Sequence, residues 1–291
     1  MKYIICILLF ILPTPLFAAP KIWDVAQEKY ISEEILLTKL SNKPHILIGI
    51  RNDNARHHRL AARLIKKLAT SGKEPVILLG NVERDRQNAF AIFRKRNKNL
   101  EQPYDATGLD MLLDWRRSGQ PNWAIIRPVL DMAMLEKYAL VASSLSRYEV
   151  GQIQHDGLKG LPEDIAEKLR PILSEPLPEE IRREFSAEIK KEYCSSLPPK
   201  AVARQILIRR IQNGLLALNI VAAKQKTAIL ITEQKYIGKN TGVPRSLAKL
   251  TGKDNHISLL FMEKPPNNQQ DDYIWHTDGP SRPAPCQLLK R

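Results

Sequence analysis

Cysteines, aromatic residues and acidic residues are all scarce in this sequence. Only three of the 291 residues are cysteines, and aromatic side chains make up 6%. So few cysteines exclude a small fold held together by disulfides, and 43% hydrophobic residues over this length exclude a disordered chain. Acidic residues number 31 against 45 basic ones. The sequence therefore predicts a folded globular protein with a strong positive charge.

Apolar runs of membrane-spanning length are also absent. Residues 1–18 carry one charge, Lys2, followed by an apolar run that is too short to cross a bilayer. This layout is typical of a secretory signal, and the small residues at its end predict cleavage after Ala18. Cys6 precedes the apolar run, so it does not fit a lipid anchor. We therefore expect a periplasmic or secreted protein.

Removal of the signal leaves a strongly basic chain. It would contain 44 basic and 31 acidic residues, a formal net charge of +13. Such an excess indicates contact with anions such as lipid headgroups, carboxylates or nucleic acid. An exported protein rarely meets nucleic acid, so we expect an anionic small molecule or an anionic lipid surface as partner.

Export also changes the interpretation of Cys194 and Cys286. In an oxidising compartment an even pair of thiols predicts a disulfide. This bond would pin the C-terminal tail and stabilise the fold by about 4 kcal/mol in the chain-entropy model. Two free buried thiols or an intermolecular bridge are the alternatives. A metal site is not expected, because the two cysteines lie far apart in the sequence.

Five apolar runs have the length of strands. They do not alternate with polar residues, which is typical of strands buried on both faces, and the segments between them have helical spacing. The predicted fold class is α/β, with a largely parallel sheet covered by helices on both faces. The runs are Pro44–Ile50, Pro75–Gly80, Tyr138–Ser143, Thr227–Thr232 and His256–Met262.

The predicted helices have local signals. One begins at Ala55, with Asp53 or Asn54 available as N-cap and Gly72 as the C-terminal stop. A second starts near Glu83 and buries two phenylalanines.

The later part of the chain divides into three segments. We expect a helical insertion at about residues 150–200, then a long helix within residues 194–232, which contain no Asp or Glu. The tail, residues 265–291, is rich in Pro, Asn and Gln and predicts an ordered extended arm around the domain. No clean linker is present, so residues 19–291 are predicted to form a single domain.

Eight segments, in order, resemble blocks of one family, the ChaN-like haem-binding proteins, which are related to the Tiki and TraB proteases and to erythromycin esterase. The resemblance covers nearly the whole mature chain. Its blocks are IWDVAQEKYISEEILLTKL, NDNARHH, ERDRQ, LLDWRRSGQPNWAIIRPVLDMA, YALVASSLSR, EYC with LP, TGVPRSLAKL and DDYIWHTDGPSRPAPC.

The resemblance implies chemistry at the carboxyl ends of the strands, where family members carry Gly-Glu-x-His, Leu-Glu-Met-Phe and Gly-Asn-x-His. Here residues 49–52 read Gly-Ile-Arg-Asn, residues 79–82 read Leu-Gly-Asn-Val, and residues 232–235 read Thr-Glu-Gln-Lys. Ile, Gly and Asn side chains do not transfer protons, and Asn is a weak metal ligand. The sequence therefore predicts a pocket without catalytic or metal-binding residues, and Glu233 is the one carboxylate close to the family pattern.

Binding can survive where catalysis does not. Haem carriers hold iron through Tyr or His while basic residues meet the propionates. The candidates are Tyr236, Tyr148, His57 and His58, with Arg127 for an anion. Each also has a structural interpretation: the histidines as hydrogen-bonded residues of a first helical turn, the tyrosines as packing residues, and Arg127 as a solvated side chain.

These observations lead to three functional hypotheses. The first is an exported, non-catalytic protein that binds haem or a similar anionic ligand in iron uptake, favoured by a basic excess expected around the pocket. The second is an envelope interaction protein that docks to a protein partner or to anionic lipid. The third is a residual metal-independent hydrolase that uses Glu233. Whether the chain forms a homodimer is left open.

Overall fold

The computed structural model describes residues 22–70, 72, 74–100, 104–224, 226–263, 271–282 and 286. The predicted signal, residues 1–18, lies outside the described residues, and so does the predicted cleavage site. Within the described ranges, no helix combines the length and the apolar character that a membrane crossing requires.

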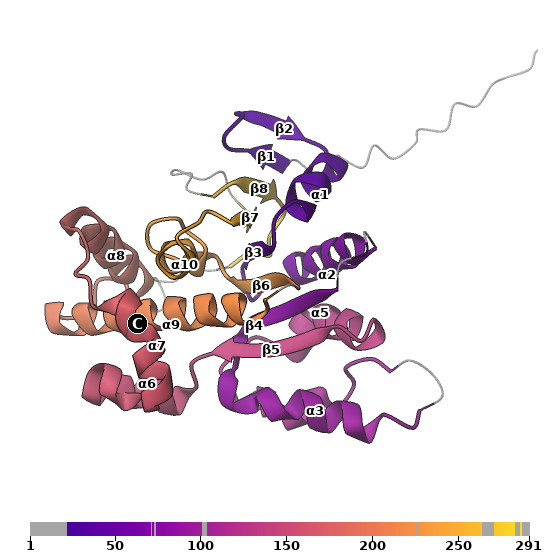
Figure 1. The fold of residues 1–291 in the computed structure, drawn as a ribbon, viewed down its shortest axis with the longest axis horizontal. Coiled ribbons are helices and arrows are strands. Elements are labelled where there is room, and N and C mark those ends of the chain that lie inside the picture. The colour runs from indigo at the N-terminus through magenta and orange to yellow at the C-terminus, as the bar shows by residue number, and fades with distance from the viewer. Residues whose placement is uncertain are drawn as a thin grey trace, which may run out of the picture.

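One eight-stranded sheet organises the fold (Figure 1). The strand order is β2-β1-β8-β7-β3-β6-β4-β5, and the six strands from β8 to β5 run parallel. The predicted largely parallel α/β sheet is therefore confirmed. The strands are β1 (Ile22–Asp24), β2 (Lys29–Ile31), β3 (His45–Ile50), β4 (Pro75–Glu83), β5 (Ala139–Ser144), β6 (Thr227–Glu233), β7 (His256–Met262) and β8 (Tyr273–His276).

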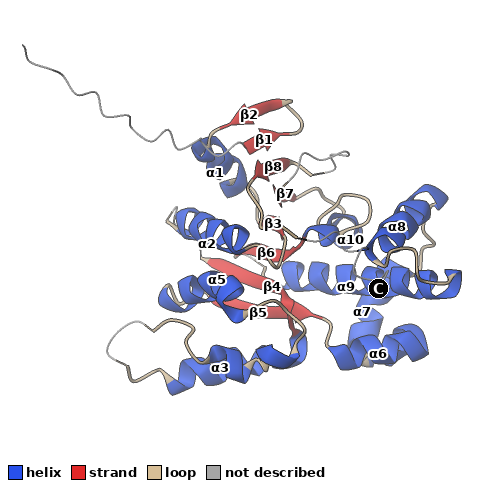
Figure 2. Cartoon of the chain, turned by 180° about the vertical axis from the view of Figure 1, so that it is seen from behind, coloured by secondary structure: helices blue, strands red, loops and turns tan. Residues whose placement is uncertain are grey.

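Helices cover both faces of the sheet (Figure 2). Ile46 and Ile48 pack toward α1, α2 and α5, whereas Leu47 packs toward α9 and α10. Successive side chains of a strand point to opposite faces, so a continuous apolar run fills two cores at once. The helices are α1 (Glu33–Ser41), α2 (Ala55–Ala69), α3 (Gln87–Arg96), α4 (Leu109–Leu112), α5 (Trp123–Leu135), α6 (Arg147–Asp156), α7 (Glu163–Leu173), α8 (Glu179–Glu192), α9 (Pro199–Ala222) and α10 (Val243–Thr251).

The expected start of α2 is present in the structure. Asn54, and not Asp53, is the N-cap, because its side-chain oxygen accepts hydrogen bonds from the backbone N–H groups of Arg56 and His57. Gly72 follows the helix with a positive φ of 84°. This cap fixes the turn between β3 and α2, which borders the site described below.

Helices α6, α7 and α8 lie beside the sheet and pack on the long helix α9 (Figure 1). Leu169 and Ile211 belong to one separate apolar cluster, and Phe185 and Ile206 belong to another. Helix α9 also reaches under the sheet, where Leu216 packs against β3 and β6. The long helix thus connects the helical insertion to the central core.

Part of the predicted C-terminal arm is a strand of the sheet. Residues 273–276 form β8, which lies inside the sheet between β7 and β1. The reason is apolar burial, because Ile274 is fully buried and Trp275 is 1% exposed. This part of the tail therefore belongs to the core and does not wrap around it.

Two glutamines cover the edge strand β5. The side chain of Gln87 donates to the carbonyl of Leu140 and accepts from the N–H of Ala142. Gln212 on α9 likewise accepts from the N–H of Leu145 and donates to the carbonyl of Ser143. Each amide replaces a neighbouring strand, so backbone groups that would otherwise be open to another chain are satisfied.

Candidate functional site

An open cleft lies at the carboxyl ends of β3 and β6, where parallel α/β sheets place their sites. Its volume is about 770 Å³, within the range of small-molecule sites. The cleft is lined by Ile50, Arg51, Asn52, Asp53, Gly119, Gln120, Pro121, Glu188, Lys191, Glu192, Arg209, Glu233, Gln234 and Lys235.

One wall of the cleft is a loop held by two tryptophans. The rings of Trp115 and Trp123 meet edge to face with centroids 5.4 Å apart. The indole N–H of Trp115 donates to the carbonyl of Pro121 at 2.8 Å. The two aromatics therefore clamp the loop, and they fix a wall that lines the cleft.

The cleft does not have the expected basic excess. Its lining contains four basic side chains and four acidic ones. Helix α8 packs alongside α9 and brings carboxylates to the cleft. The basic residues are Arg51, Lys191, Arg209 and Lys235, and the acidic ones are Asp53, Glu188, Glu192 and Glu233.

A chain of ion pairs runs through the cleft. The buried guanidinium of Arg209 binds Glu188 at 2.8 Å and also pairs with Glu192. The ammonium of Lys235 then bridges Glu192 at 2.6 Å and Glu233 at 3.2 Å. Each of these three carboxylates therefore has a cationic partner in the cleft.

Glu188 and Glu192 are site residues that the sequence pattern did not identify. They lie four residues apart on α8, so both face the cleft, but an amphipathic charged helix gave no reason to separate them from a solvated surface. Burial raises the pKa of Glu188, although hydrogen bonds from Thr241 and Arg209 oppose that effect. Glu188 is the carboxylate of the cleft whose protonation burial favours.

Glu233 is held in place at the cleft wall. One carboxylate oxygen accepts a hydrogen bond from the side-chain amide of Asn52 at 3.3 Å, and the other pairs with Lys235. The amide of Asn52 also donates to Gln120 at 3.2 Å. Glu233 is therefore positioned and neutralised by its neighbours, with no imidazole among the lining residues to share a proton.

The strand ends beside the cleft are closed by packing. Ile50 is 1% exposed at the end of β3, where the resemblance implies Glu. On β4, Gly80 lies against Thr232 of β6, and a Cβ atom added to Gly80 would come within 2.4 Å of the Thr232 hydroxyl. Where the resemblance places Glu on β4 and Gly on β6, this chain has Gly and Thr. The threonine thus fills the space that a larger residue at position 80 would need.

His57 is a structural residue. It is fully buried and stacks on Phe261 with ring centroids 5.4 Å apart. Its Nδ1 accepts from the backbone N–H of Arg51 at 3.0 Å, so Nε2 carries the proton and donates to Thr277 at 2.8 Å. Burial lowers the pKa of His57 to about 4, which keeps the ring neutral. Both ring nitrogens are committed, so His57 is not placed to bind iron.

His58 is also buried and neutral. Its Nε2 donates to the carbonyl of Asn52 at 3.0 Å, and burial lowers the pKa of His58 to about 4. Its Nδ1 has no hydrogen-bond partner in the described part of the chain. At 1% exposure this nitrogen does not reach the cleft.

The residues beside the cleft that are closed off by packing are called the closed strand ends. They are Ile50, Gly80, Thr232, His57 and His58.

The remaining predicted residues lie in different places. Tyr236 packs in the core beside the cleft, where burial raises the pKa of its hydroxyl. Arg127 on α5 binds Asp131 through two contacts of 3.1 Å and Asp105 at 2.7 Å, so it is a structural ion pair. Tyr148 on α6 is 74% exposed. The structure therefore does not bring the five predicted residues together.

The tail fastens the loop between β3 and α2. The guanidinium of Arg282 pairs with Asp53 and with Glu263, both at 2.5 Å, and Asn54 donates to Glu263 at 2.6 Å. Burial would raise the pKa of Glu263, but the hydrogen bonds from Arg282 and Asn54 lower it. The loop beside the cleft is thus held by charged groups from the end of the chain.

A disulfide continues this attachment. The predicted bond between Cys194 and Cys286 is present in the structure, with Cα atoms 5.5 Å apart and a sequence separation of 92. It joins the tail to the segment that follows α8, the helix that supplies Glu188 and Glu192. The tail is therefore anchored on both sides of the cleft.

The cleft suits the edges of a haem better than its iron. Basic side chains can meet propionates, and Ile50 and Pro121 offer apolar wall. The lining includes no His, Tyr, Cys or Met, the usual axial ligands. Of the four predicted iron ligands only Tyr148 is exposed. No group of three or more His, Cys, Asp or Glu side chains among the described residues is arranged to hold a metal ion.

The overall fold is similar to solved structures. ChaN of Campylobacter jejuni, described as binding haem cofacially, is 16% identical over 90% of this chain and 98% of that chain, with a TM-score of 0.73. The type III effector HopBA1 is 9% identical over 85% and 94% of the two chains, at a TM-score of 0.45. A mutant of the erythromycin esterase EreC is 14% identical over 90% and 83%, at 0.43. The last two likenesses are too weak to support a conclusion.

The family is shown by the sequence itself. A comparison with curated protein sequences finds no significant match. The family model for haem-binding uptake proteins of the Tiki superfamily, ChaN, matches residues 36–247, which is more than half of the chain. This match confirms the resemblance found in the sequence blocks. The chain therefore belongs to the ChaN family of haem-binding uptake proteins within the Tiki superfamily.

Proposed function

We propose that this chain is an exported, non-catalytic haem-binding protein of iron uptake. The observation that carries the proposal is the open cleft with basic side chains on its walls, in a chain of a haem-binding uptake family. The solved relative from Campylobacter jejuni is described as binding haem. Export is supported by the disulfide between Cys194 and Cys286, since such bonds persist in oxidising compartments.

Two basic residues of the cleft are available for propionates. Lys191 forms no ion pair among the described residues, whereas Arg209 and Lys235 are each shared between two carboxylates. Arg51 is 43% exposed in its side chain and lies 3.6 Å or more from its acidic neighbours. A haem propionate would meet Arg51 and Lys191 without breaking a close ion pair.

The iron would need a ligand from outside the cleft lining. Tyrosine is an established haem ligand, and the exposed ring of Tyr148 makes it the accessible candidate. Tyr148 does not line the cleft, so we propose it as an iron ligand separately from the propionate contacts of Arg51 and Lys191.

The absence of catalysis is supported by the state of the carboxylates. Glu233 is paired with Lys235, Glu188 with Arg209, and the positions where the family carries Glu are Ile50 and Gly80. Proton transfer needs a group whose pKa lies near the working pH and that can reach the substrate. A Glu233→Gln variant should therefore leave any esterase or peptidase activity of the preparation unchanged, and loss of such activity would support the hydrolase hypothesis instead.

Titration with haemin tests the binding proposal. The mature protein should give a saturable shift of the Soret band at micromolar concentration, and Arg51→Ala with Lys191→Ala should weaken binding by about tenfold or more, since each charge-assisted contact contributes about 1 to 3 kcal/mol. A variant with Lys168→Ala and Arg170→Ala, on exposed α7, is the matched control. Equal affinity in both double variants would remove the cleft from the proposal.

The same titration separates the role of Tyr148. If this residue binds the iron, Tyr148→Phe should move the Soret maximum of the complex, because the axial oxygen is lost. An unchanged spectrum would exclude Tyr148 as ligand and leave the propionate contacts to be judged on the cleft variants alone. If none of these proteins gives a saturable change in the Soret band, the proposal of haem binding itself is overturned.

A further inference from the structure

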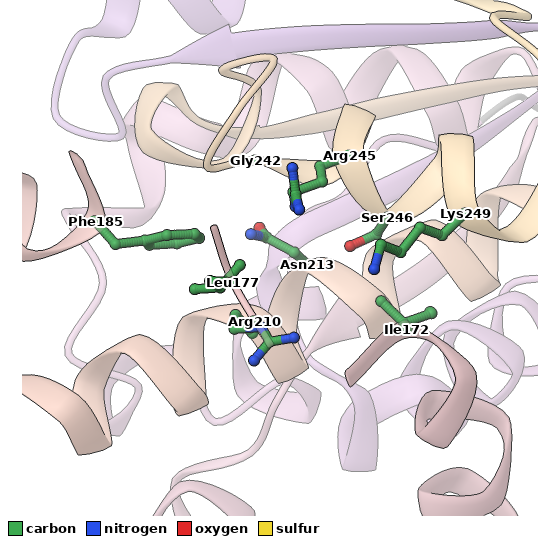
Figure 3. Close-up of a pocket in the computed structure, with 9 residues that line it drawn as sticks. All are labelled: Ile172, Leu177, Phe185, Arg210, Asn213, Gly242, Arg245, Ser246 and Lys249. Atoms are coloured by element: carbon green, nitrogen blue, oxygen red, sulfur yellow. The ribbon is translucent and has the colours of Figure 1, made fainter. Parts of the chain in front are cut away.

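A second, much smaller cavity lies in the helical insertion, between α9, α10 and the connection from α7 to α8 (Figure 3). Its volume is about 20 Å³, room for roughly one water-sized group. It shares no lining residue with the cleft. The lining residues are Ile172, Leu177, Phe185, Arg210, Asn213, Gly242, Arg245, Ser246 and Lys249.

Positive charge is in excess around this cavity. Three basic side chains, Arg210, Arg245 and Lys249, extend toward the cavity from two helices (Figure 3). The neighbouring carboxylate is Glu175, which pairs with Lys249. Arg245 forms no ion pair with any described residue. The surroundings of the cavity therefore carry more positive than negative charge, unlike the balanced cleft.

The two guanidinium groups disfavour each other. Arg210 is half-buried, and its Nη2 donates to the carbonyls of Leu173 and Glu175 at 3.2 and 3.0 Å. Burial lowers the pKa of Arg210, and the nearby charge of Arg245 lowers it further. Two like charges beside an enclosed space are stabilised by an anion between them.

The start of α10 adds to the positive potential. Its N-cap is Gly242, so no side chain caps the first turn. The unpaired N–H groups and the dipole of a helix N-terminus both favour an anion. Ser246 also lines the cavity and is 6% exposed.

Asn213 restricts the kind of ligand that the cavity can bind. It is 2% exposed, and its side-chain Nδ2 donates to the carbonyl of Thr241 at 2.7 Å. That bond fixes the amide, so Oδ1 is an acceptor, and Oδ1 has no partner within the described residues. A buried acceptor without a donor is unfavourable by about 1 to 3 kcal/mol. Its missing partner must carry an N–H or O–H group.

We propose that this cavity binds a small oxyanion that keeps a hydroxyl group at neutral pH, such as hydrogen phosphate or hydrogen carbonate. The negative oxygens would meet Arg210, Arg245 and the start of α10, and the hydroxyl would donate to Asn213. Only one oxygen fits inside, so the rest of the anion lies at the opening. Sulfate and chloride lack a hydroxyl and would leave Asn213 unpaired.

Anion titration of the mature protein, without haemin, tests the site. Phosphate and hydrogen carbonate are titrated by calorimetry against sulfate and chloride at constant ionic strength. We expect phosphate or hydrogen carbonate to bind about tenfold more tightly than sulfate, because one charge-free hydrogen bond contributes about that much. The anion of these two that binds more tightly is identified as the ligand whose hydroxyl donates to Asn213. Equal binding of all four anions would overturn the proposal.

Variants locate the binding. Arg245→Gln should reduce the affinity for the preferred anion at least about tenfold. Arg183→Gln, an exposed residue of α8, is the matched control and should bind like the unchanged protein. If Arg245→Gln fails to fold, Arg245→Lys is used instead. Lysine keeps the charge but loses the paired N–H donors of the guanidinium, so this variant should still bind the anion more weakly. Unchanged affinity in the folded Arg245 variant would place the anion elsewhere and overturn the site.

Discussion

The cleft and the closed strand ends lie side by side, but ionisable groups have opposite charge states in them. In the cleft, burial acts to lower the pKa of Lys235, but nearby carboxylates raise it, and Lys235 stays charged. In the closed strand ends, His57 and His58 are kept neutral by burial. Charge is retained where opposite charges lie close, and is lost where apolar packing surrounds the group.

This difference separates two kinds of position at the same edge of the sheet. Ile50, at a position where the resemblance implies Glu, is part of the core at 1% exposure. Half of the charged residues of the cleft come from α8 and α9, and the other half lie at or just after the ends of β3 and β6: Arg51, Asp53, Glu233 and Lys235. The cleft is therefore open beside strand ends that are closed by packing.

Acid should have the largest effect of the changes considered, because it protonates the buried His57 and His58 of the closed strand ends. The pKa of His57 and of His58 is about 4 in the folded chain against 6.5 in the unfolded chain, so between these values the unfolded chain binds protons that the folded chain does not. Stability present above pH 6.5 should be lost as the pH falls toward 4, by about 3 kcal/mol for each histidine. Urea unfolding at pH 7, 5.5 and 4 measures this loss.

The exposed His155 provides the control for that experiment. Its side chain is 87% exposed, so His155→Gln should show the same loss of stability with acid as the unchanged protein. A free energy of unfolding that stays constant from pH 7 to 4 would contradict the assignment of neutral buried rings to His57 and His58.

Reduction of the disulfide should weaken the connection between the two regions. The bond from Cys194 to Cys286 closes a loop of 92 residues in sequence separation, which corresponds to about 4 to 5 kcal/mol in the chain-entropy model. Unfolding by guanidinium is compared for the protein with and without a reductant, and for Cys194→Ser with Cys286→Ser. The double variant should be insensitive to the reductant, and equal midpoints for oxidised and reduced protein would contradict a structural role of the bond.

The sequence predicted the sheet well where strands are buried on both faces, and poorly where they are short. Continuous apolar runs identified β3, β4, β5, β6 and β7, because two-sided burial leaves no polar positions. The strands β1, β2 and β8 have only three or four residues, too few for a periodic signal. Their place in the sheet depends on pairing between the two ends of the chain.

The site was predicted less well than the fold. The departure at residues 49–52 correctly directed attention to the ends of the strands, but residue type alone led us to assign His57, His58 and Arg127 to binding. Their partners, such as Thr277 and Asp105, are distant in sequence, so only the folded chain shows that these side chains are already committed. Glu188 enters the cleft through the packing of α8 on α9, which no local pattern reports.

The contact of Gly80 with Thr232 tests whether the closed strand ends are a matched packing. Gly80→Ala should destabilise the protein by about 2 kcal/mol, because its Cβ would lie 2.4 Å from the threonine hydroxyl and overpacking has a cost of this size. The matched control is Gly151→Ala on α6, where nothing lies within 4 Å and alanine should stabilise the helix by about 0.5 to 1 kcal/mol. Thermal unfolding of both variants measures the difference.

Thr232→Gly completes the comparison as a double-mutant cycle. Alone it should destabilise the protein, because it empties buried space in a strand. Together with Gly80→Ala it restores the family's order of a small residue on β6 and a larger one on β4, so the double variant should lose less stability than the sum of the two single changes. Additive effects would mean that the two positions are not coupled. The closing of the strand ends would then rest on Ile50 and the histidines alone, and the exchange of Gly between β4 and β6 would have no structural consequence for the cleft beside them.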